Sequence, residues 1–281
     1  MKMKVNKYRT NICGELTISD LGKNVVLSGF VQTIRDHGGV MFLDLRDHAG
    51  ITQVVVHDES MLEGVSKETV IKVTGEVIRR DEETVNTKLL TGEIEIKCES
   101  LEVLSPKAHT LPFEIDGMQE VNEEVRLKYR YLDMRNDKVK SNILLRSEIL
   151  HYLRNKMYDL GFTEVQTPIL TVSSPEGARD FVVPSRKFKG KFYALPQAPQ
   201  IYKELLMVGG VDKYFQVAPC FRDEDSRKDR TLEFYQLDLE MSFITEEEVL
   251  ELGENIFYDV FTKYSDKEVS KKPFRRIDYM D

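Results

Sequence analysis

The segment from Tyr214 to Phe243 constrains the fold most, because two long strand-like runs flank a charged loop, Asp223 to Thr231. In the second run, apolar residues alternate with polar or acidic ones, which is the period of a strand with one buried face. The predicted core face holds Leu237, Leu239, Met241 and Phe243. The other face holds Phe234, Gln236, Asp238, Glu240 and Ser242. If the two runs form a hairpin, Arg222 from the first run can join Phe234 and the carboxylates on one floor.

The first hundred residues have the pattern of short strands separated by turns. A tight hairpin connection is expected at residues 36–39, and one short helical stretch at Ser60–Ser66. Five strands with one short helix predict a small closed barrel of the OB type, whereas a sandwich would need more strands. The expected strands are Asn24–Gln32, Val40–Leu45, Ile51–Val56, Val70–Val77 and Ile94–Leu104.

The pattern changes after this region, which predicts three parts: a barrel at 1–105, a linker or hinge at 106–137, and a second domain at 138–281. The second domain begins with helical spacing from Lys138, and Gly161 stands where a left-handed cap residue is needed. Further elements are expected in this domain. They are strands at Phe162–Leu170 and Phe192–Leu195 and a helix at Pro199–Val208. Helices beside an antiparallel sheet place the chain in the α+β class.

Composition excludes several classes of protein. The 281 residues suggest two domains, and no run of eighteen apolar residues could cross a membrane. The N-terminus lacks the apolar stretch of a signal peptide, so a cytosolic location is expected. The five histidines have neither the paired spacing nor the cysteine neighbours of a zinc site, so no resident metal is expected.

The charge distribution leaves two interpretations of one segment open. The formal net charge of −8 is unlike that of a non-specific nucleic-acid binder, which is normally basic. Residues 126–154, however, contain eight Lys or Arg against three Asp or Glu. Such a run is either a solvated helix face or a surface that faces phosphates.

The floor of the predicted hairpin has the groups that a nucleotide site needs. A guanidinium such as that of Arg222 matches phosphate oxygens with a rigid fork of donors, and a ring such as that of Phe234 can stack on a purine. Carboxylates beside them can hold a metal ion that bridges phosphates or can accept from an ammonium group. A sheet surface that carries only salt bridges remains the alternative. Gln200 and Lys203 project from one helix face, and Glu176 lies in a loop that could act as a lid, although each alone is more often an ordinary surface residue.

Three stretches together resemble a known family. Residues 174–180 (SPEGARD), 193–207 (YALPQAPQIYKELLM) and 220–243 (CFRDEDSRKDRTLEFYQLDLEMSF) are similar to the catalytic domain of bacterial-type aspartyl-tRNA synthetases, which are class II aminoacyl-tRNA synthetases. Residues 126–135 (RLKYRYLDMR) and the barrel sequence FLDLRDHAGITQVVV are also similar to this family. The resemblance covers essentially the whole chain, with several motifs in the family's order.

The resemblance implies a two-step reaction and a set of site residues. L-Aspartate attacks ATP, as its Mg²⁺ complex, to form aspartyl-adenylate, and the aspartyl group then passes to the terminal adenosine of tRNA(Asp). Arg222 and Glu224 are the implied catalytic residues. Glu176, Gln200, Lys203, Arg222 and Asp238 are implied to bind aspartate, and Arg222, Asp223, Glu224 and Phe234 to bind ATP.

For the barrel, the resemblance implies an anticodon-binding surface on which bases stack and are read by edge hydrogen bonds. Its implied residues are Arg35, Phe42, Gln53, Arg80 and Glu95. Without the resemblance, a ring in the barrel core is the default expectation for Phe42. His37 resembles the subset of the family that also charges tRNA(Asn). A homodimer with Pro168 at the subunit contact is implied as well.

The sequence also departs from the family pattern. Thr231 and Leu232 replace a common Gln-Pro pair, and residues 138–281 contain the first and second class II motifs but not the third. The chain is therefore expected to be a C-terminally truncated product that is inactive alone. A non-catalytic RNA-binding module derived from a synthetase is the rival interpretation, and a related class II enzyme for lysine, asparagine or a non-tRNA amide is another.

Overall fold

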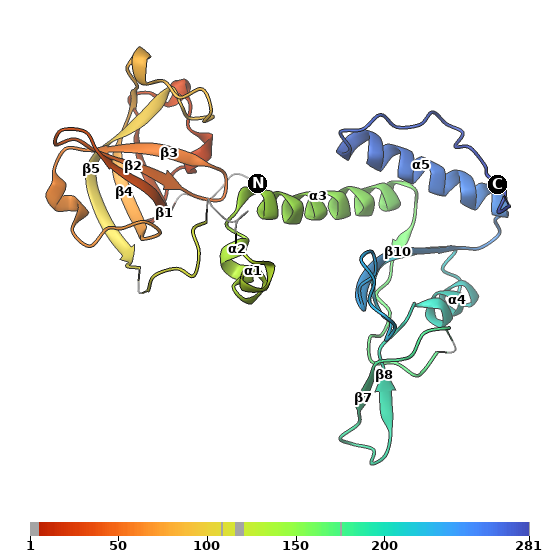
Figure 1. The fold of residues 1–281 in the computed structure, drawn as a ribbon. Helices are drawn as coiled ribbons and strands as arrows, with labels where there is room; N and C mark the ends of the chain where they lie inside the picture. Colours follow the sequence, from red (N-terminus) through yellow and green to blue (C-terminus); the bar gives the residue numbers. More distant parts are fainter. Residues whose placement is uncertain (1–5, 108, 116–120, 175, 281) are drawn as a thin grey trace. The chain divides into compact units, whose positions relative to one another are not determined.

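The N-terminal part of the chain is a closed five-stranded barrel in a computed structural model that describes residues 6–107, 109–115, 121–174 and 176–280. The strands follow one another around the barrel in the order β1, β2, β3, β5 and β4, with β3 and β5 parallel and the other pairs antiparallel. This arrangement confirms the predicted OB-type barrel. The strands are β1 (Asn24–Asp36), β2 (Met41–Arg46), β3 (Ile51–Val56), β4 (Val70–Arg79) and β5 (Ile94–Ser105), shown in red to yellow in Figure 1.

Alternation along the strands fills the barrel. Leu43 and Leu45 of β2 are fully buried in the core, whereas Phe42 and Asp44, which alternate with them, lie on the outer face and are only partly buried. Gly75 allows β4 to bend against β5, because a Cβ there would lie 2.2 Å from the Lys97 carbonyl oxygen. The helix expected at Ser60–Ser66 is instead a short 3-10 helix, Glu59–Leu62. Three further 3-10 helices cover Cys13–Glu15, Ile18–Asp20 and Glu82–Thr84.

The chain divides into two compact units, Met1–Glu114 and Ile115–Asp281. The second unit begins with three helices, α1 (Glu123–Lys128), α2 (Arg130–Asp133) and α3 (Asp137–Asp159). Two of them lie within the stretch predicted as a linker, where they are too short to show a clear helical period in the sequence. Buried Asp133 anchors both, because it accepts from Arg126 and Arg130.

A three-stranded sheet of order β10, β9, β6 forms the centre of the second unit. α3 and α5 (Glu246–Tyr264) cover one face, and α4 (Gln200–Val208) lies against the other (Figure 1). The covered core face of β10 carries Leu237 and Leu239, which pack with Met157 and Ile256 from the two long helices. The strands are β6 (Thr163–Glu164), β9 (Lys213–Phe221) and β10 (Glu233–Met241). A separate hairpin pairs β7 (Val182–Pro184) with β8 (Phe192–Ala194).

Two sequence-based expectations for this unit are wrong. The strand predicted at Phe162–Leu170 is reduced to Thr163–Glu164, because after Val165 the chain bonds to the Gln216 side chain, through Thr167, and no longer to the backbone of β9. Phe243 is not in the core, because β10 ends at Met241 and the Phe243 ring is fully exposed at a backbone φ of 56°. Gly161 does adopt the expected left-handed conformation, with φ of 81°. Across the described residues, every helix is too short or too polar to cross a bilayer.

Candidate functional site

The sheet face toward α4 gathers most of the polar residues that the sequence singled out. Strands β9 and β10 are antiparallel, with Asp238 opposite Gln216 and Phe234 opposite Cys220. Because alternate residues share a face, Asp238, Glu240 and Phe234 all belong to the face opposite the Leu237 and Leu239 core. The predicted parity of this strand is therefore confirmed up to residue 241. We call this face the polar floor.

Lys203 reaches the polar floor from α4. Its Nζ lies 3.0 Å from Asp238 Oδ1 and 3.2 Å from Glu240 Oε2. The side chains of Lys203 and Asp238 are only 12% and 11% exposed. This lysine is therefore held inside the site by two carboxylates and is not the ordinary surface residue that its type alone would suggest.

Burial and charge act against each other on this ion pair. Burial raises the pKa of Asp238, and the hydrogen bond and charge of Lys203 offset only part of that increase. Burial by itself lowers the pKa of Lys203, but the hydrogen bonds and charges of Asp238 and Glu240 outweigh it and raise the pKa. Lys203 thus stays cationic at neutral pH, while the buried carboxylate depends on a neighbouring cation for its charge.

Arg222 and Phe234 form the second half of the polar floor. The guanidinium carbon of Arg222 lies 5.1 Å from the centroid of the Phe234 ring, so the cation sits over the ring. The Arg222 Nε atom also donates a long hydrogen bond of 3.4 Å to the Gln197 carbonyl oxygen. Glu224 follows directly in the loop, where its N–H donates to the Arg222 carbonyl oxygen at 3.1 Å.

The buried thiol of Cys220 indicates that these charges converge. Its pKa is raised to about 11, mainly by burial; the charge of Arg222 lowers it, whereas the charges of Asp238 and Glu176 raise it. All three charged groups therefore shift the pKa of one thiol of β9. Asp238 and Arg222 belong to the hairpin, whereas Glu176 comes from the loop at 173–180, more than forty residues earlier.

Gln197 holds that loop against the sheet, a role that was not predicted from the sequence. Its side chain is 1% exposed, and its Nε2 donates to the Ala178 carbonyl oxygen at 2.9 Å and to Asp180 Oδ1 at 2.5 Å. The Asp223 N–H donates to the Arg179 carbonyl oxygen at 3.0 Å. An amide between two prolines has no periodic pattern around it, so a local sequence signal could not have identified it.

Gln200 is placed differently from its neighbours on the floor. Its side chain is exposed and donates to Glu204 Oε1 at 2.7 Å, one turn further along α4. The carboxylate of Asp223 lies beside Arg179, 3.9 Å from its Nε atom. The structure therefore brings Lys203, Arg222, Phe234 and Asp238 together, while Gln200 and Asp223 make other contacts.

Three buried polar atoms near the floor have no hydrogen-bond partner within the described residues. They are Asp238 Oδ2, Tyr214 Oη and Gln197 Oε1. Buried polar atoms are nearly always paired, so unpaired ones are positions where a bound polar group gains a partner. An unpaired carboxylate oxygen fits a donor such as an ammonium group.

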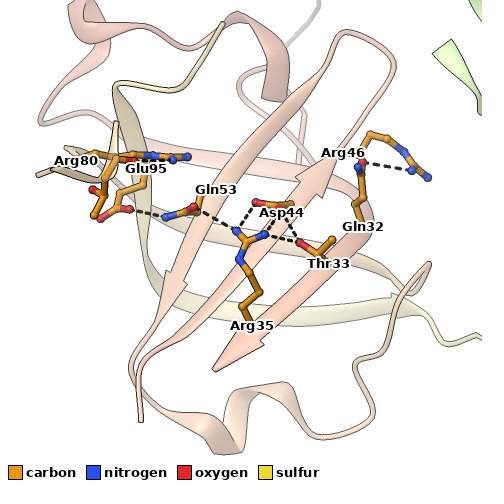
Figure 2. A network of polar contacts seen from close by, with 9 residues as sticks. Gln32, Thr33, Arg35, Asp44, Arg46, Gln53, Arg80 and Glu95 are labelled. Atoms are coloured by element: carbon orange, nitrogen blue, oxygen red, sulfur yellow. Dashed lines mark hydrogen bonds and ion pairs between the residues drawn. The ribbon is translucent and has the colours of Figure 1, made fainter. Parts of the chain in front are cut away.

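The outer face of the barrel holds a second polar network (Figure 2). Arg35 makes a bidentate ion pair with Asp44, at 2.6 and 3.0 Å, and its Nη2 lies 3.4 Å from Gln53 Oε1. Gln53 in turn donates to Glu95 Oε2 at 2.8 Å. The network runs from β1 across β2 and β3 to β5, so it presents polar groups in a line across the strands.

Phe42 and Arg80 lie at this outer face as well. The Phe42 ring is partly exposed, which excludes the barrel-core alternative for this ring. It contacts the His37 ring edge to face, with 5.5 Å between the two ring centroids. Burial lowers the pKa of Arg80 and raises that of Glu95. Among the described atoms, Arg80 Nη2 is buried without a partner. All five barrel residues predicted from the resemblance are thus found on or beside one face.

The described residues contain no group of three or more His, Cys, Asp or Glu side chains that could hold a metal ion. Mg²⁺ usually keeps several waters and binds through one or two carboxylates together with substrate phosphates.

Comparison with known protein families identifies the second unit. Residues 122–281, more than half of the chain, match the family described as tRNA synthetases class II (D, K and N). The chain belongs to this family. Residues 25–104 match the family described as OB-fold nucleic acid binding domain, in agreement with the closed barrel.

Individual relatives of this class II synthetase chain are consistent with the family. An aspartate--tRNA(Asp/Asn) ligase of Pelagibacter ubique is 54% identical over 98% of this chain and 47% of its own length. The protein of the same name from Rickettsia canadensis is 55% identical over 98% of this chain and 46% of its own. The chain thus spans about half the length of the curated relatives it matches.

A solved structure is also similar. It is asparaginyl-tRNA synthetase from Pyrococcus horikoshii complexed with asparaginyl-adenylate, 27% identical, with a TM-score of 0.78. The match covers 94% of this chain and 58% of that one.

Proposed function

We propose that the polar floor binds an aspartyl-adenylate, and that the protein acts as an aspartate–tRNA ligase. The observation that carries the proposal is the buried cation of Lys203 beside Asp238, on the face that also holds Arg222 over Phe234. The names of the relatives at 54–55% identity support aspartate as the amino acid and tRNA(Asp) or tRNA(Asn) as the acceptor.

Each group on the floor has a chemical task in this proposal. Arg222 neutralises charge between the substrate carboxylate and the α-phosphate of ATP, where charge develops during attack. Phe234 stacks on adenine. The guanidinium of Arg222 already lies over the same phenylalanine ring. The unpaired Asp238 Oδ2 accepts from the α-ammonium group, assisted by Gln200 after its amide leaves Glu204.

Lys203 selects the side chain of the amino acid. The side-chain carboxylate of a bound aspartate replaces Asp238 and Glu240 as the partner of Lys203, so the buried cation stays paired. An asparagine amide offers no charge in that position and leaves the lysine less compensated. Glu176 contributes from the loop at 173–180, which Gln197 fastens to the sheet.

ATP is the nucleotide in this proposal, and we infer that it arrives as its Mg²⁺ complex. Asp223 and Glu224 adjoin Arg222 and supply the one or two carboxylates that such an ion takes from a protein. When bound, the ion shields the negative charge of the phosphates. Binding and orientation remain the work of Arg222, Phe234 and the carboxylates of the floor.

The barrel surface is proposed to bind the anticodon. Phe42 offers a ring for base stacking, and Gln53, Glu95 and Arg35 offer edge donors and acceptors in a line beside it. Because Arg35 and Glu95 already have protein partners, the network fixes their directions before RNA binds. Whether tRNA(Asn) is accepted beside tRNA(Asp) is decided by charging assays with both.

A homodimer is proposed, with the residues around Pro168 at the contact. The chain after Pro168 exposes three large apolar side chains, Ile169, Leu170 and Val172, at 42%, 56% and 70%. A cluster of exposed apolar side chains within four residues is typical of an interaction surface. Light scattering measures the mass directly. A location in the cytosol stays a prediction.

The test of the proposed function is aspartate-dependent exchange of pyrophosphate into ATP. The chain is assayed both alone and fused to the part of the Pelagibacter ubique relative that it does not span. The fusion is expected to exchange with aspartate and not with asparagine, and its Lys203→Met variant is expected to lose several kcal/mol of transition-state stabilisation. Exchange by Lys203→Met at the parent rate would remove Lys203 from the site. tRNA binding without any exchange by the fusion would favour a non-catalytic RNA-binding module.

A further inference from the structure

A buried amide beside the polar floor is bonded to two parts of the proposed site. Gln197 lies in the connection between β8 and α4, and it is 1% exposed. Its side chain donates to the loop at 173–180, whereas its backbone carbonyl oxygen accepts from Arg222, directly after β9. One residue therefore contacts both the loop that carries Glu176 and the arginine of the floor.

The side chain of Gln197 joins the two ends of the loop. An amide nitrogen has two hydrogens to donate, and Gln197 Nε2 bonds to the Ala178 carbonyl oxygen at 2.9 Å and to Asp180 Oδ1 at 2.5 Å. The other oxygen of that carboxylate, Asp180 Oδ2, accepts from Ser173 Oγ at 2.5 Å. The first and last residues of the loop thus share one carboxylate, and Gln197 holds that carboxylate from inside the protein.

Glu176 lies between these joined residues, and its charge reaches the polar floor. Burial is the main cause of the raised pKa of the Cys220 thiol, and the charges of Asp238 and Glu176 raise it as well. Asp238 Oδ2 is buried without a partner among the described atoms. Two carboxylates, one from the sheet and one from the loop, therefore bring negative charge to this part of the floor, which suits an α-ammonium group.

The backbone of Gln197 supports the other half of the site. Its carbonyl oxygen accepts from Arg222 Nε at 3.4 Å, and the Pro196 carbonyl oxygen accepts from the Phe221 N–H at 2.9 Å. These bonds need only the main chain of residues 196 and 197, so a change of the Gln197 side chain leaves them in place. The side chain and the backbone of one residue thus act on different halves of the site.

The bonds of Gln197 need an uncharged group with two donors. A carboxylate at position 197 has no donor and repels Asp180, and an ammonium group places another charge in the interior. A methionine side chain is similar in length and is flexible enough to fill the same space, but it donates no hydrogen bond. Gln197→Met therefore removes both bonds to the loop and keeps most of the packing.

We propose that Gln197 is a positioning residue for recognition of the α-ammonium group of the aspartyl ligand. It acts through Asp180 and the loop, which hold Glu176 at the floor. The inference rests on the proposed function for the identity of the ligand. It divides the task among the residues: Gln197 and Glu176 serve the amino group, Lys203 serves the side chain, and Arg222 serves the phosphate.

The experiment compares two ligands on the 281-residue chain by isothermal titration calorimetry. One is a non-hydrolysable aspartyl-adenylate analogue, and the other is the same analogue with hydrogen in place of the α-ammonium group. Gln197→Met is expected to bind the first ligand roughly tenfold more weakly and the second as tightly as the parent does. Tyr202→Phe is the matched control, because it also removes side-chain hydrogen bonding within this unit, and both of its affinities should match the parent.

A second set of variants tests the route through Glu176. In the Glu176→Ala background, Gln197→Met is expected to cause no further loss of the first ligand, since both changes remove the same contact. Asp180→Ala breaks the same connection from the loop side, at a partly exposed position, and is expected to give the same ligand-specific loss. Urea unfolding establishes which variants are folded, and Asp180→Ala decides the question if Gln197→Met is not.

The outcomes that contradict this inference differ from those that contradict the proposed function. Equal weakening of both ligands by Gln197→Met, or no weakening of either, would overturn the inference and leave Lys203 and Arg222 in their proposed roles. Losses that add in the Glu176→Ala background, or equal affinity of the parent for the two ligands, would overturn it as well. Binding of neither ligand by the parent would overturn the proposed function itself.

Discussion

At the scale of single residues, Lys203 matters for the protein both as a selector and as a counter-ion. Two carboxylates lie within 3.2 Å of its Nζ, and one of them, Asp238, is 11% exposed. Removing one partner of a buried ion pair leaves an uncompensated charge, which costs far more than an exposed pair is worth. The family resemblance predicted that this lysine belongs to the site but not this second role.

Lys203→Met is expected to lower the free energy of unfolding by about 3 kcal/mol at pH 7. Without Lys203, burial and the charge of Glu240 raise the pKa of Asp238 further above its ordinary value. A carboxyl with a raised pKa in the folded state stabilises the fold at low pH, and this stability is lost as pH rises through that pKa. The deficit of the variant should therefore shrink as pH falls toward the ordinary carboxyl range.

Urea unfolding of the parent and variant chains at several pH values measures this deficit. The double variant Lys203→Met with Asp238→Asn is the control, and it should recover part of the lost stability because the uncompensated charge is gone. A deficit that is the same at every pH would show that packing, rather than the charge of Asp238, accounts for the loss.

Tyr214 makes a contrasting prediction. Its side chain is fully buried and its hydroxyl has no hydrogen-bond partner among the described residues, while burial and the charge of Asp238 raise its pKa. Tyr214→Phe removes an unsatisfied buried group and should leave the free energy of unfolding unchanged or raise it by about 1 kcal/mol. Tyr202→Phe is the matched control, because the Tyr202 hydroxyl is hydrogen-bonded to Thr171.

The control variant should lose about 1 kcal/mol, as expected for a net hydrogen bond. Both values come from urea unfolding at neutral pH. A loss at Tyr214 as large as that at Tyr202 would mean that the Tyr214 hydroxyl has a native partner.

At the scale of elements, β2 carries residues for both roles of the barrel, which are packing of its core and the proposed contact to RNA. Leu43 points into the core and Phe42 points outward, one residue apart. Leu43→Ala should cost about 2–5 kcal/mol of stability through the cavity it leaves, whereas Phe42→Ala should cost about 1 kcal/mol. In the fusion protein, Phe42→Ala should raise the KM for tRNA and leave pyrophosphate exchange intact.

Steady-state aminoacylation and exchange kinetics measure these two effects separately. Loss of both activities in Phe42→Ala would give the ring a packing role in place of a contact to RNA. Leu43→Ala serves as the comparison, since any effect that it shares with Phe42→Ala arises from weakening of the barrel.

The elements also show what the sequence could and could not predict. Period-two alternation in β10 identified its buried face, because the pattern of a strand with one covered face must keep its apolar residues on that side. The ends of elements were less predictable. Thr163–Glu164 is all that remains of a nine-residue strand prediction, since the pairing of β6 with β9 is a tertiary contact that no local pattern encodes.

The site was predictable where it follows from strand parity and less so elsewhere. Phe234 and Asp238 share a face by alternation alone, and Arg222 follows from the hairpin. Lys203 and Glu176 come from separate elements, so their approach to the floor could be expected only from the family resemblance. Neither strand parity nor the family resemblance identified Gln197, because its role is to join a loop to the sheet.

At the scale of the whole molecule, two compact units carry two different kinds of recognition. The barrel unit presents a partly exposed ring with a line of fixed polar groups, which suits single-stranded bases. The second unit encloses a charged floor, which suits a small ligand with opposite charges at defined positions. The family match to the second unit and the OB-fold match to the first agree with this division.

Binding of adenylate analogues to the chain tests the central claim most directly. Isothermal titration calorimetry compares non-hydrolysable aspartyl-adenylate and asparaginyl-adenylate analogues on the parent chain, Arg222→Ala and Lys203→Met. We predict that the parent prefers the aspartyl analogue, that Lys203→Met loses this preference, and that Arg222→Ala weakens both analogues. Equal affinity of the parent for the two analogues, or a preference that survives Lys203→Met, would contradict the account.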